Sequence, residues 1–143
     1  VLLYQARGEK RKIYQQVVDL AKRLNASVYD ASGMNYRIRK HGKQYVSPIE
    51  FLNLIYFAEA VVTVSFHGTA LSLVFRKTFI SVNGGNIERV SEVLTQLGLT
   101  DRIVSDDNLP ENDIDYDKVT SQLNILRKKS LSFLLDSLKN DRE

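Results

Sequence analysis

The run Ala60–Val64, with the sequence AVVTV, restricts the fold of this chain more than any other stretch. Five consecutive small or β-branched residues are typical of a strand that is buried on both faces, as in a parallel sheet covered by helices. From Thr69 to Phe75 the apolar residues are three or four positions apart, which is the spacing of a helix. The stretch Ser65–Thr69 is therefore predicted to be a strand-to-helix turn, with the helix beginning near Thr69.

Strand and helix patterns alternate along the chain. Ser47-Pro48-Ile49-Glu50 predicts a helix start, because serine caps the helix, proline suits its first turn and Glu50 completes a capping box. The alternation predicts an α/β fold, a Rossmann-like open parallel sheet with helices on both faces. The predicted strands are 1–4, 27–30, 60–64, 78–82 and 102–104, and the predicted helices are 10–24, 48–58, 69–75, 87–97 and 116–138.

The acidic, turn-rich segment 106–117 leads into the last predicted helix. It lacks the glycine and the terminal glutamate of a calcium-binding loop, so we interpret it as a solvated connector. The helix that follows is amphipathic, and its apolar stripe is expected to face the core. The residues of this stripe are Val119, Leu123, Leu126, Leu134 and Leu138.

Composition excludes several kinds of site. The 143 residues include no cysteine, which excludes disulfides and thiol chemistry. The two histidines, His41 and His67, are too far apart in the sequence to form a metal-ligand pattern, so no metal is expected. No apolar run approaches the ~20 residues that span a membrane. We therefore expect no transmembrane segment, and a protein that is cytoplasmic or peripheral to the inner membrane.

The basic segment Arg37–Lys43 has tyrosines on both sides and reads as a small hairpin. Basic residues near aromatic ones can contact nucleic acid, but no RNA- or DNA-binding motif accompanies this segment. A solvated hairpin face explains the same charges. We therefore expect no nucleic acid among the partners.

The chain begins directly with a core strand, Val1–Tyr4, without a methionine, a leader or a polar tail. Chain termini usually lie at the surface and fray. We therefore expect residues 1–143 to be a single Rossmann-like domain, the C-terminal fragment of a longer two-domain protein. The missing N-terminal domain would then be its first partner.

Ligands of open parallel sheets bind beyond the carboxyl ends of the strands, where the strand order reverses. With the order 2-1-3-4-5, this crevice lies between the first and third strands and brings Arg7 beside the Ser65–Thr69 turn. A helix N-terminus carrying His67 and facing an arginine suits a phosphate or carboxylate. A helix cap with a packed histidine and a surface arginine is the structural alternative. The two glycines of Asn83–Asn86 equally suit a ligand or a tight turn.

The sequence resembles the C-terminal half of the polysaccharide pyruvyl transferases. The most specific block is Ser65-Phe66-His67-Gly68-Thr69, preceded by Ser47-Pro48-Ile49-Glu50-Phe51-Leu52 and followed by Lys77-Thr78-Phe79-Ile80. The later stretch from Glu88 to Arg102 fits the same pattern, so the resemblance covers nearly the whole chain. It implies the second Rossmann-like domain of a two-domain enzyme similar to GT-B glycosyltransferases.

The resemblance also implies an activity. Family members move a pyruvyl group from phosphoenolpyruvate to sugar hydroxyls of cell-surface polysaccharides and release phosphate. This chain would be the donor-binding half of such a transferase in polysaccharide biosynthesis, inactive as a fragment, with phosphoenolpyruvate as co-substrate, no further cofactor and a saccharide acceptor. Some members carry arginine two positions before the histidine, where this chain has Ser65. The positive charge would then come from Arg7 or Arg89.

His67 is the candidate catalytic residue, because an imidazole that titrates near neutrality suits proton transfer in either direction. Two other functions stay open. One is a glycosyltransferase domain that binds a nucleotide sugar, although no acidic residue near Ser65 is placed to hold a ribose. The other is a binding module of the same fold without catalysis. The residues predicted to bind the substrates are Arg7, Ser65, Phe66, Gly68, Thr69, Asn83, Asn86 and Arg89.

Overall fold

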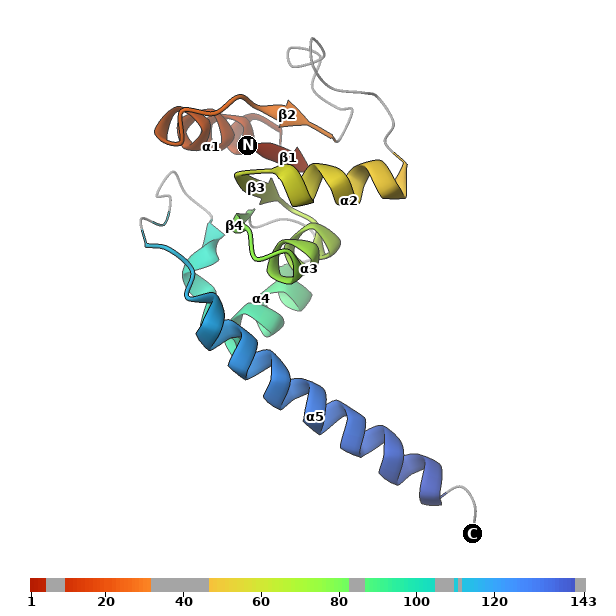
Figure 1. Ribbon diagram of the computed structural model, residues 1–143. Coiled ribbons are helices and arrows are strands. Elements are labelled where there is room, and N and C mark those ends of the chain that lie inside the picture. Colours follow the sequence, from red (N-terminus) through yellow and green to blue (C-terminus); the bar gives the residue numbers. More distant parts are fainter. Residues whose placement is uncertain (5–9, 32–46, 83–86, 105–109, 111, 141–143) are drawn as a thin grey trace.

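The computed structural model describes residues 1–4, 10–31, 47–82, 87–104, 110 and 112–140. Within this part of the chain, five strands form one parallel sheet in the order β2-β1-β3-β4-β5 (Figure 1). The predicted fold and strand order are therefore confirmed. The strands are β1 (Leu2–Tyr4), β2 (Tyr29–Asp30), β3 (Ala60–Thr63), β4 (Thr78–Val82) and β5 (Ile103–Val104). The helices are α1 (Lys10–Arg23), α2 (Pro48–Phe57), α3 (Phe66–Val74), α4 (Ile87–Gln96), the 3-10 turn η1 (Thr100–Arg102) and α5 (Tyr116–Asn140).

The central strand is β3, as predicted from its β-branched run. It pairs with β1 through Leu2–Val61 and with β4 through Val61–Phe79. All four of its residues are buried completely. Two-sided burial explains why this strand shows no alternation between apolar and polar residues.

Helices cover both faces of the sheet (Figure 1). On one face, Val17 and Leu20 of α1 pack against strand residues such as Val62. On the other face, the apolar sides of α2, α3 and α4 meet Val61 and Phe79. The side chains therefore divide into two clusters, one on each side of the sheet.

The predicted capping box at the start of α2 is present. The Ser47 hydroxyl oxygen accepts the Glu50 N–H at 3.2 Å, and the Ser47 N–H donates to Glu50 Oε2 at 2.9 Å. These two bonds satisfy backbone groups that a helix start leaves without partners. They set where the chain turns back towards the centre of the sheet.

Helix α3 begins at Phe66, three residues earlier than the apolar spacing predicts. The Thr69 N–H already donates to the Ser65 carbonyl oxygen at 3.0 Å, which closes the first helical turn. The predicted turn Ser65–Thr69 is thus an N-cap residue followed by helix. Apolar spacing missed this turn because its residues are mostly polar or small.

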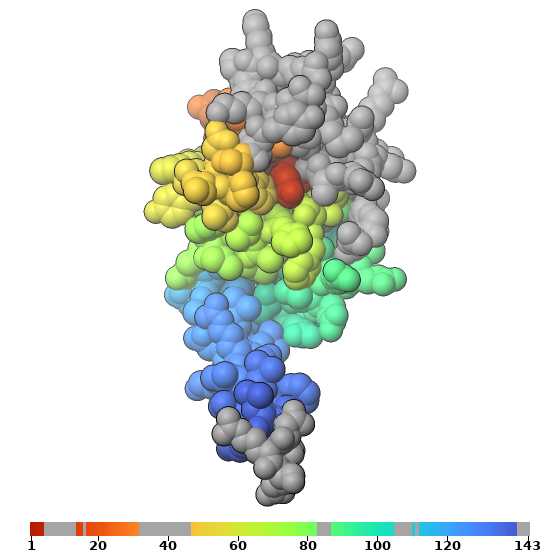
Figure 2. Space-filling model, turned by 90° about the vertical axis from the view of Figure 1, so that its right-hand side faces the viewer, coloured from red at the N-terminus to blue at the C-terminus, as the bar shows by residue number. Residues whose placement is uncertain are grey.

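Helix α5 leaves the body of the protein after its first turns (Figures 1 and 2). Val119 is buried, but Leu134 and Leu138 are 56% and 63% exposed, which corrects the prediction that the whole stripe is buried. The helix continues past the edge of the layer it packs on, so its second half has no part of the described protein beside it. Among the described helices, none has the length and apolarity needed to cross a membrane.

Candidate functional site

The pairing of β1 with β3 brings two loop starts together. Tyr4 and Thr63, the last residues of these strands, are direct partners in the parallel register. The segment after Tyr4 and the start of α3 therefore leave the sheet at the same edge, where parallel sheets bind ligands. Arg7 belongs to that segment but lies outside the described residues.

The structure brings the central block of predicted site residues together in the first turn of α3. His67, the predicted catalytic residue, is exposed there. Its ring lies edge-on to the ring of the half-buried Phe66, with 6.0 Å between the ring centroids. The alternative of a histidine packed in the core is therefore wrong. Ser65 occupies the N-cap position, but its side chain makes no capping hydrogen bond.

The backbone N–H groups of this turn differ in their availability. The Ser65 N–H donates to Thr63 Oγ1 at 3.0 Å, and the Thr69 N–H donates to the Ser65 carbonyl oxygen. Thr69 therefore cannot offer its N–H to an anion, contrary to our expectation. The N–H groups of Phe66, His67 and Gly68 have no partner among the described residues, as is usual at a helix start. These three groups, at the positive end of the helix dipole, can accept an anion.

Gly68, which was predicted as a substrate-binding residue, also has a packing role. A Cβ atom at this position would lie 2.4 Å from Thr63 Oγ1 and 2.9 Å from Thr63 Cβ. Only a residue without a side chain lets the first turn of α3 approach β3 this closely. The position of His67 relative to the sheet therefore depends on Gly68.

Hydroxyl groups fill the space beneath this turn. Thr69 Oγ1 and Ser81 Oγ are 2.6 Å apart, and Thr69 Oγ1 also donates to the Ser65 carbonyl oxygen at 3.2 Å. One turn further, Ser72 Oγ donates to the Gly68 carbonyl oxygen at 2.7 Å. All of these side chains are buried. Thr69 thus acts from below the turn and not as an exposed ligand-binding hydroxyl.

The other predicted site residues are not brought to this turn by the described structure. Arg89 is exposed on the first turn of α4, the helix that follows β4. Asn83 and Asn86, between β4 and α4, lie outside the described residues, as does His41. Among the described residues, no three histidine, aspartate or glutamate side chains gather closely enough to hold a metal ion.

The sequence reasoning missed Thr63 and Ser81. Both occupy the last α3-facing positions of buried strands, two residues after Val61 and Phe79, where an apolar residue would continue the pattern. The signal that could have found them is this change from apolar to hydroxyl residues on two strands at once. Strands that pair in register bring such residues to the same place.

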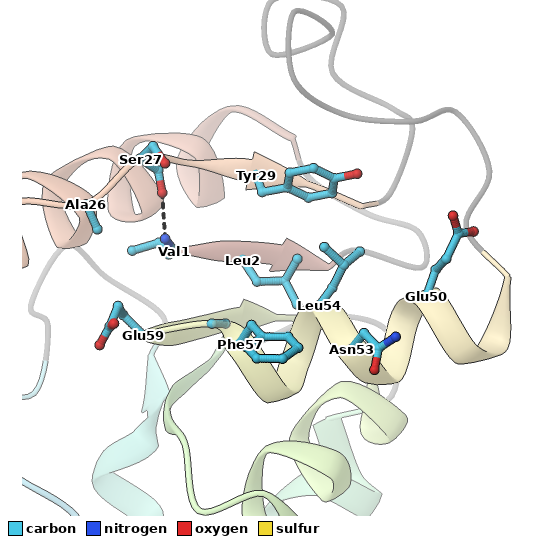
Figure 3. A pocket seen from close by; sticks show the side chains of 11 residues that line it. Val1, Leu2, Ala26, Ser27, Tyr29, Glu50, Asn53, Leu54, Phe57 and Glu59 are labelled. Carbon is cyan, nitrogen blue, oxygen red and sulfur yellow. Dashed lines mark hydrogen bonds between the residues drawn. The ribbon is translucent and has the colours of Figure 1, made fainter.

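A separate cavity of about 550 Å³ lies along α2, mostly at the amino ends of the strands (Figure 3). Apolar side chains form much of it, among them Leu2, Leu54 and Phe57, with Tyr29 and Glu59 as polar contributions. None of the described residues predicted for the site lines this cavity. The cavity and the first turn of α3 are therefore distinct features of the molecule.

Comparison with known proteins identifies the family. No curated protein and no solved structure matches the chain. The sequence model of the family described as polysaccharide pyruvyl transferase matches residues 6–86, which run from before α1 to the end of the β4–α4 connection and include all of α3. The resemblance noted over residues 88–102 lies outside that match. Because the match spans more than half of the sequence, this chain belongs to the polysaccharide pyruvyl transferase family.

Proposed function

We propose that this chain is the donor-binding part of an enzyme that transfers a pyruvyl group from phosphoenolpyruvate to sugar hydroxyls of a cell-surface polysaccharide. The observation that supports this most is the first turn of α3. It presents an exposed His67 beside three N–H groups without described partners, at the sheet edge where ligands bind. The turn lies within the residues that match the transferase family.

The reaction defines what the site must provide. The methylene carbon of phosphoenolpyruvate gains a proton and becomes a methyl group, and one sugar hydroxyl oxygen bonds to the neighbouring carbon. A second hydroxyl of the sugar then bonds to that carbon as its bond to the phosphate oxygen breaks. One hydroxyl proton balances the new methyl group, and the other leaves with phosphate. The site therefore needs a proton-transfer group and a holder for a departing anion.

His67 and the turn around it fit these two needs. An imidazole can deliver a proton to carbon or remove one from a hydroxyl. The N–H groups of Phe66, His67 and Gly68 can stabilise the negative charge that develops on the leaving phosphate. We propose that Arg7 and Arg89 add positive charge, because Ser65 stands where some members of the family carry arginine. Asn83 and Asn86 complete the proposed binding set.

We further propose that this domain works together with a second, N-terminal domain in a GT-B-like arrangement. Active sites between two α/β domains take groups from both, because one domain alone rarely positions two substrates. On this proposal the 143-residue chain alone does not turn over phosphoenolpyruvate with any sugar, and the enzyme is cytoplasmic or peripheral to the inner membrane.

The substrate class can be tested by titration of the chain with phosphoenolpyruvate and, separately, with UDP-sugars. Chemical-shift changes at His67 and Gly68 on addition of phosphoenolpyruvate alone would support the proposal. Changes with UDP-sugars alone would favour a nucleotide-sugar glycosyltransferase. Ser65 in place of arginine gives a binding module without catalysis a specific basis, and binding of phosphoenolpyruvate by an inactive full-length protein would favour it.

The role of His67 can be tested in the full-length protein. His67→Ala should lower kcat by ~10²–10⁴-fold, the range for loss of a general acid or base. The exposed position of His67 predicts a nearly unchanged melting temperature, so loss of activity would not reflect unfolding. His41→Ala serves as the control and should change kcat little. Near-normal turnover of the His67 variant would contradict the proposal.

A further inference from the structure

Two buried hydroxyl groups lie at the carboxyl ends of the two central strands. Thr63 of β3 and Ser81 of β4 are direct partners in the parallel register, and their exposed fractions are 0% and 1%. A buried hydroxyl without a hydrogen bond is costly, whereas valine or alanine would fit an apolar core without that cost. Both hydroxyls are hydrogen-bonded, and their bonds lead to one backbone segment.

That segment is the N-cap of α3. Thr63 Oγ1 accepts the Ser65 N–H at 3.0 Å, and Thr69 Oγ1 donates to the Ser65 carbonyl oxygen at 3.2 Å. Because the single hydroxyl proton of Thr69 is used in this bond, the proton in the 2.6 Å contact between Thr69 and Ser81 comes from Ser81. The peptide groups on both sides of the Ser65 Cα atom are thus held from within the core.

The direction of one free N–H group follows from this arrangement. The Ser65 carbonyl and the Phe66 N–H belong to the same planar trans peptide group, in which C=O and N–H point in opposite directions. Two donors from Thr69, its N–H and its hydroxyl, hold the Ser65 oxygen towards the helix. The Phe66 N–H must therefore point the other way, out of the start of α3.

We infer that Thr63, Thr69 and Ser81, here called the hydroxyl cluster, are positioning residues that fix the backbone at the start of α3 and orient its free N–H groups. The use of these groups for an anion rests on the proposed function, whereas the orientation itself does not. None of the three hydroxyls contacts the ligand. They act by keeping the N–H groups in place before the ligand arrives, which lowers the cost of binding.

Three pairs of variants of the full chain test the inference. Thr63→Val and Thr69→Val remove a hydroxyl and keep the side-chain shape, whereas Thr63→Ser and Thr69→Ser keep the hydroxyl. Ser81→Ala removes the outermost hydroxyl, and Ser72→Ala is the matched control, because Ser72 is equally buried in α3 but bonds to the Gly68 carbonyl oxygen. Hydrogen exchange of the Ser65 amide, the NMR order parameter of the Phe66 N–H and the affinity for inorganic phosphate are measured for each.

We expect Thr63→Val to speed exchange of the Ser65 amide by about 10-fold or more relative to the Val61 amide, since the bond that protects it is lost. Thr69→Val should lower the Phe66 order parameter from about 0.85 towards the flexible range below about 0.6. Both valine variants should bind phosphate roughly 3- to 30-fold more weakly. Ser81→Ala should show smaller changes in the same direction, and the serine variants and Ser72→Ala should behave like the natural protein in all three measurements.

Other outcomes would overturn the inference. If the valine variants keep the exchange rate of Ser65 and the order parameter of Phe66, the hydroxyls hold nothing. If serine and valine variants lose them equally, side-chain packing and not the hydroxyl sets the turn. If the natural protein binds no phosphate while exchange and order parameter respond as expected, the inference about the backbone stands and the proposed function fails.

Discussion

Replacement of Gly68 by alanine should disturb both the fold and the site. The added methyl carbon would lie 2.4 Å from Thr63 Oγ1, about 1 Å short of ordinary van der Waals contact. Rotation of the Thr63 side chain gives no relief, because its Cγ2 atom would also lie at 3.1 Å and its Cβ atom, which does not move on rotation, at 2.9 Å. The start of α3 must therefore move away from β3.

The cost can be estimated from three contributions. Overpacking of a well-packed core costs typically ~1–3 kcal/mol. Displacement of α3 also lengthens the bond from the Ser65 N–H to Thr63 Oγ1, a further ~1 kcal/mol. Alanine is ~1 kcal/mol better than glycine within a helix, which offsets one of these losses. The expected net loss of unfolding free energy is about 1–3 kcal/mol, which corresponds to a fall in Tm of roughly 3–12 °C.

Thermal unfolding and phosphate titration of the same variant would measure the two effects. Gly98→Ala is the matched control, because Gly98 has a φ of +68° and a Cβ atom added there would meet no atom within 4 Å. It should lose ~1 kcal/mol through backbone strain alone and leave phosphate affinity unchanged. In Gly68→Ala, affinity should fall together with stability, and Thr63→Ala in the same chain should restore part of both. A Gly68→Ala protein with the Tm and the affinity of the natural chain would refute this reasoning.

Three further changes have defined outcomes. Arg102→Ala should lower the unfolding free energy by ~3 kcal/mol or more in urea titrations, because the guanidinium is buried and donates to the Asn112 carbonyl oxygen. Burial raises the pKa of Tyr116 above its ordinary 10, so its ionisation opposes folding at high pH; the stability difference between the natural protein and Tyr116→Phe should be constant below pH 10 and shrink by ~1.4 kcal/mol per pH unit above it. Ser47→Ala should cost ~1 kcal/mol, and Glu50→Gln, which keeps a capping partner, should cost less.

The fold followed from features that sequence reports directly. The apolar run at Ala60–Val64 predicted a central strand because burial on both faces leaves no polar position. The capping box at Ser47 depends on residue types at fixed spacing, and such local chemistry does not need the rest of the fold. Strand order followed from the single long connection between β2 and β3, once right-handed crossovers are assumed.

The errors have a common physical origin. Apolar periodicity reports which residues are suited to burial, but hydrogen bonds and surrounding structure decide where an element begins and what it contacts. Helix α3 begins at Phe66 because the Ser65 carbonyl accepts an N–H, a feature with no apolar signature. Leu134 of α5 fits the stripe begun by Val119, yet the layer beneath it ends earlier. Arg102, a residue type usually exposed, is buried through contacts with Asp101 and Asn112 that no spacing rule predicts.

The same reasoning explains why hydroxyl residues are found where the central strands end. A net contribution of about 1 kcal/mol for a buried hydrogen bond is comparable to what a well-packed methyl group contributes. Stability alone therefore hardly distinguishes threonine from valine at position 63. The two differ in direction, because a methyl group packs in many orientations whereas a hydroxyl holds one backbone group at one angle. The change from apolar to hydroxyl residues after Val62 thus marks where the sheet stops serving only as a core and begins to set the geometry of its ligand-binding edge.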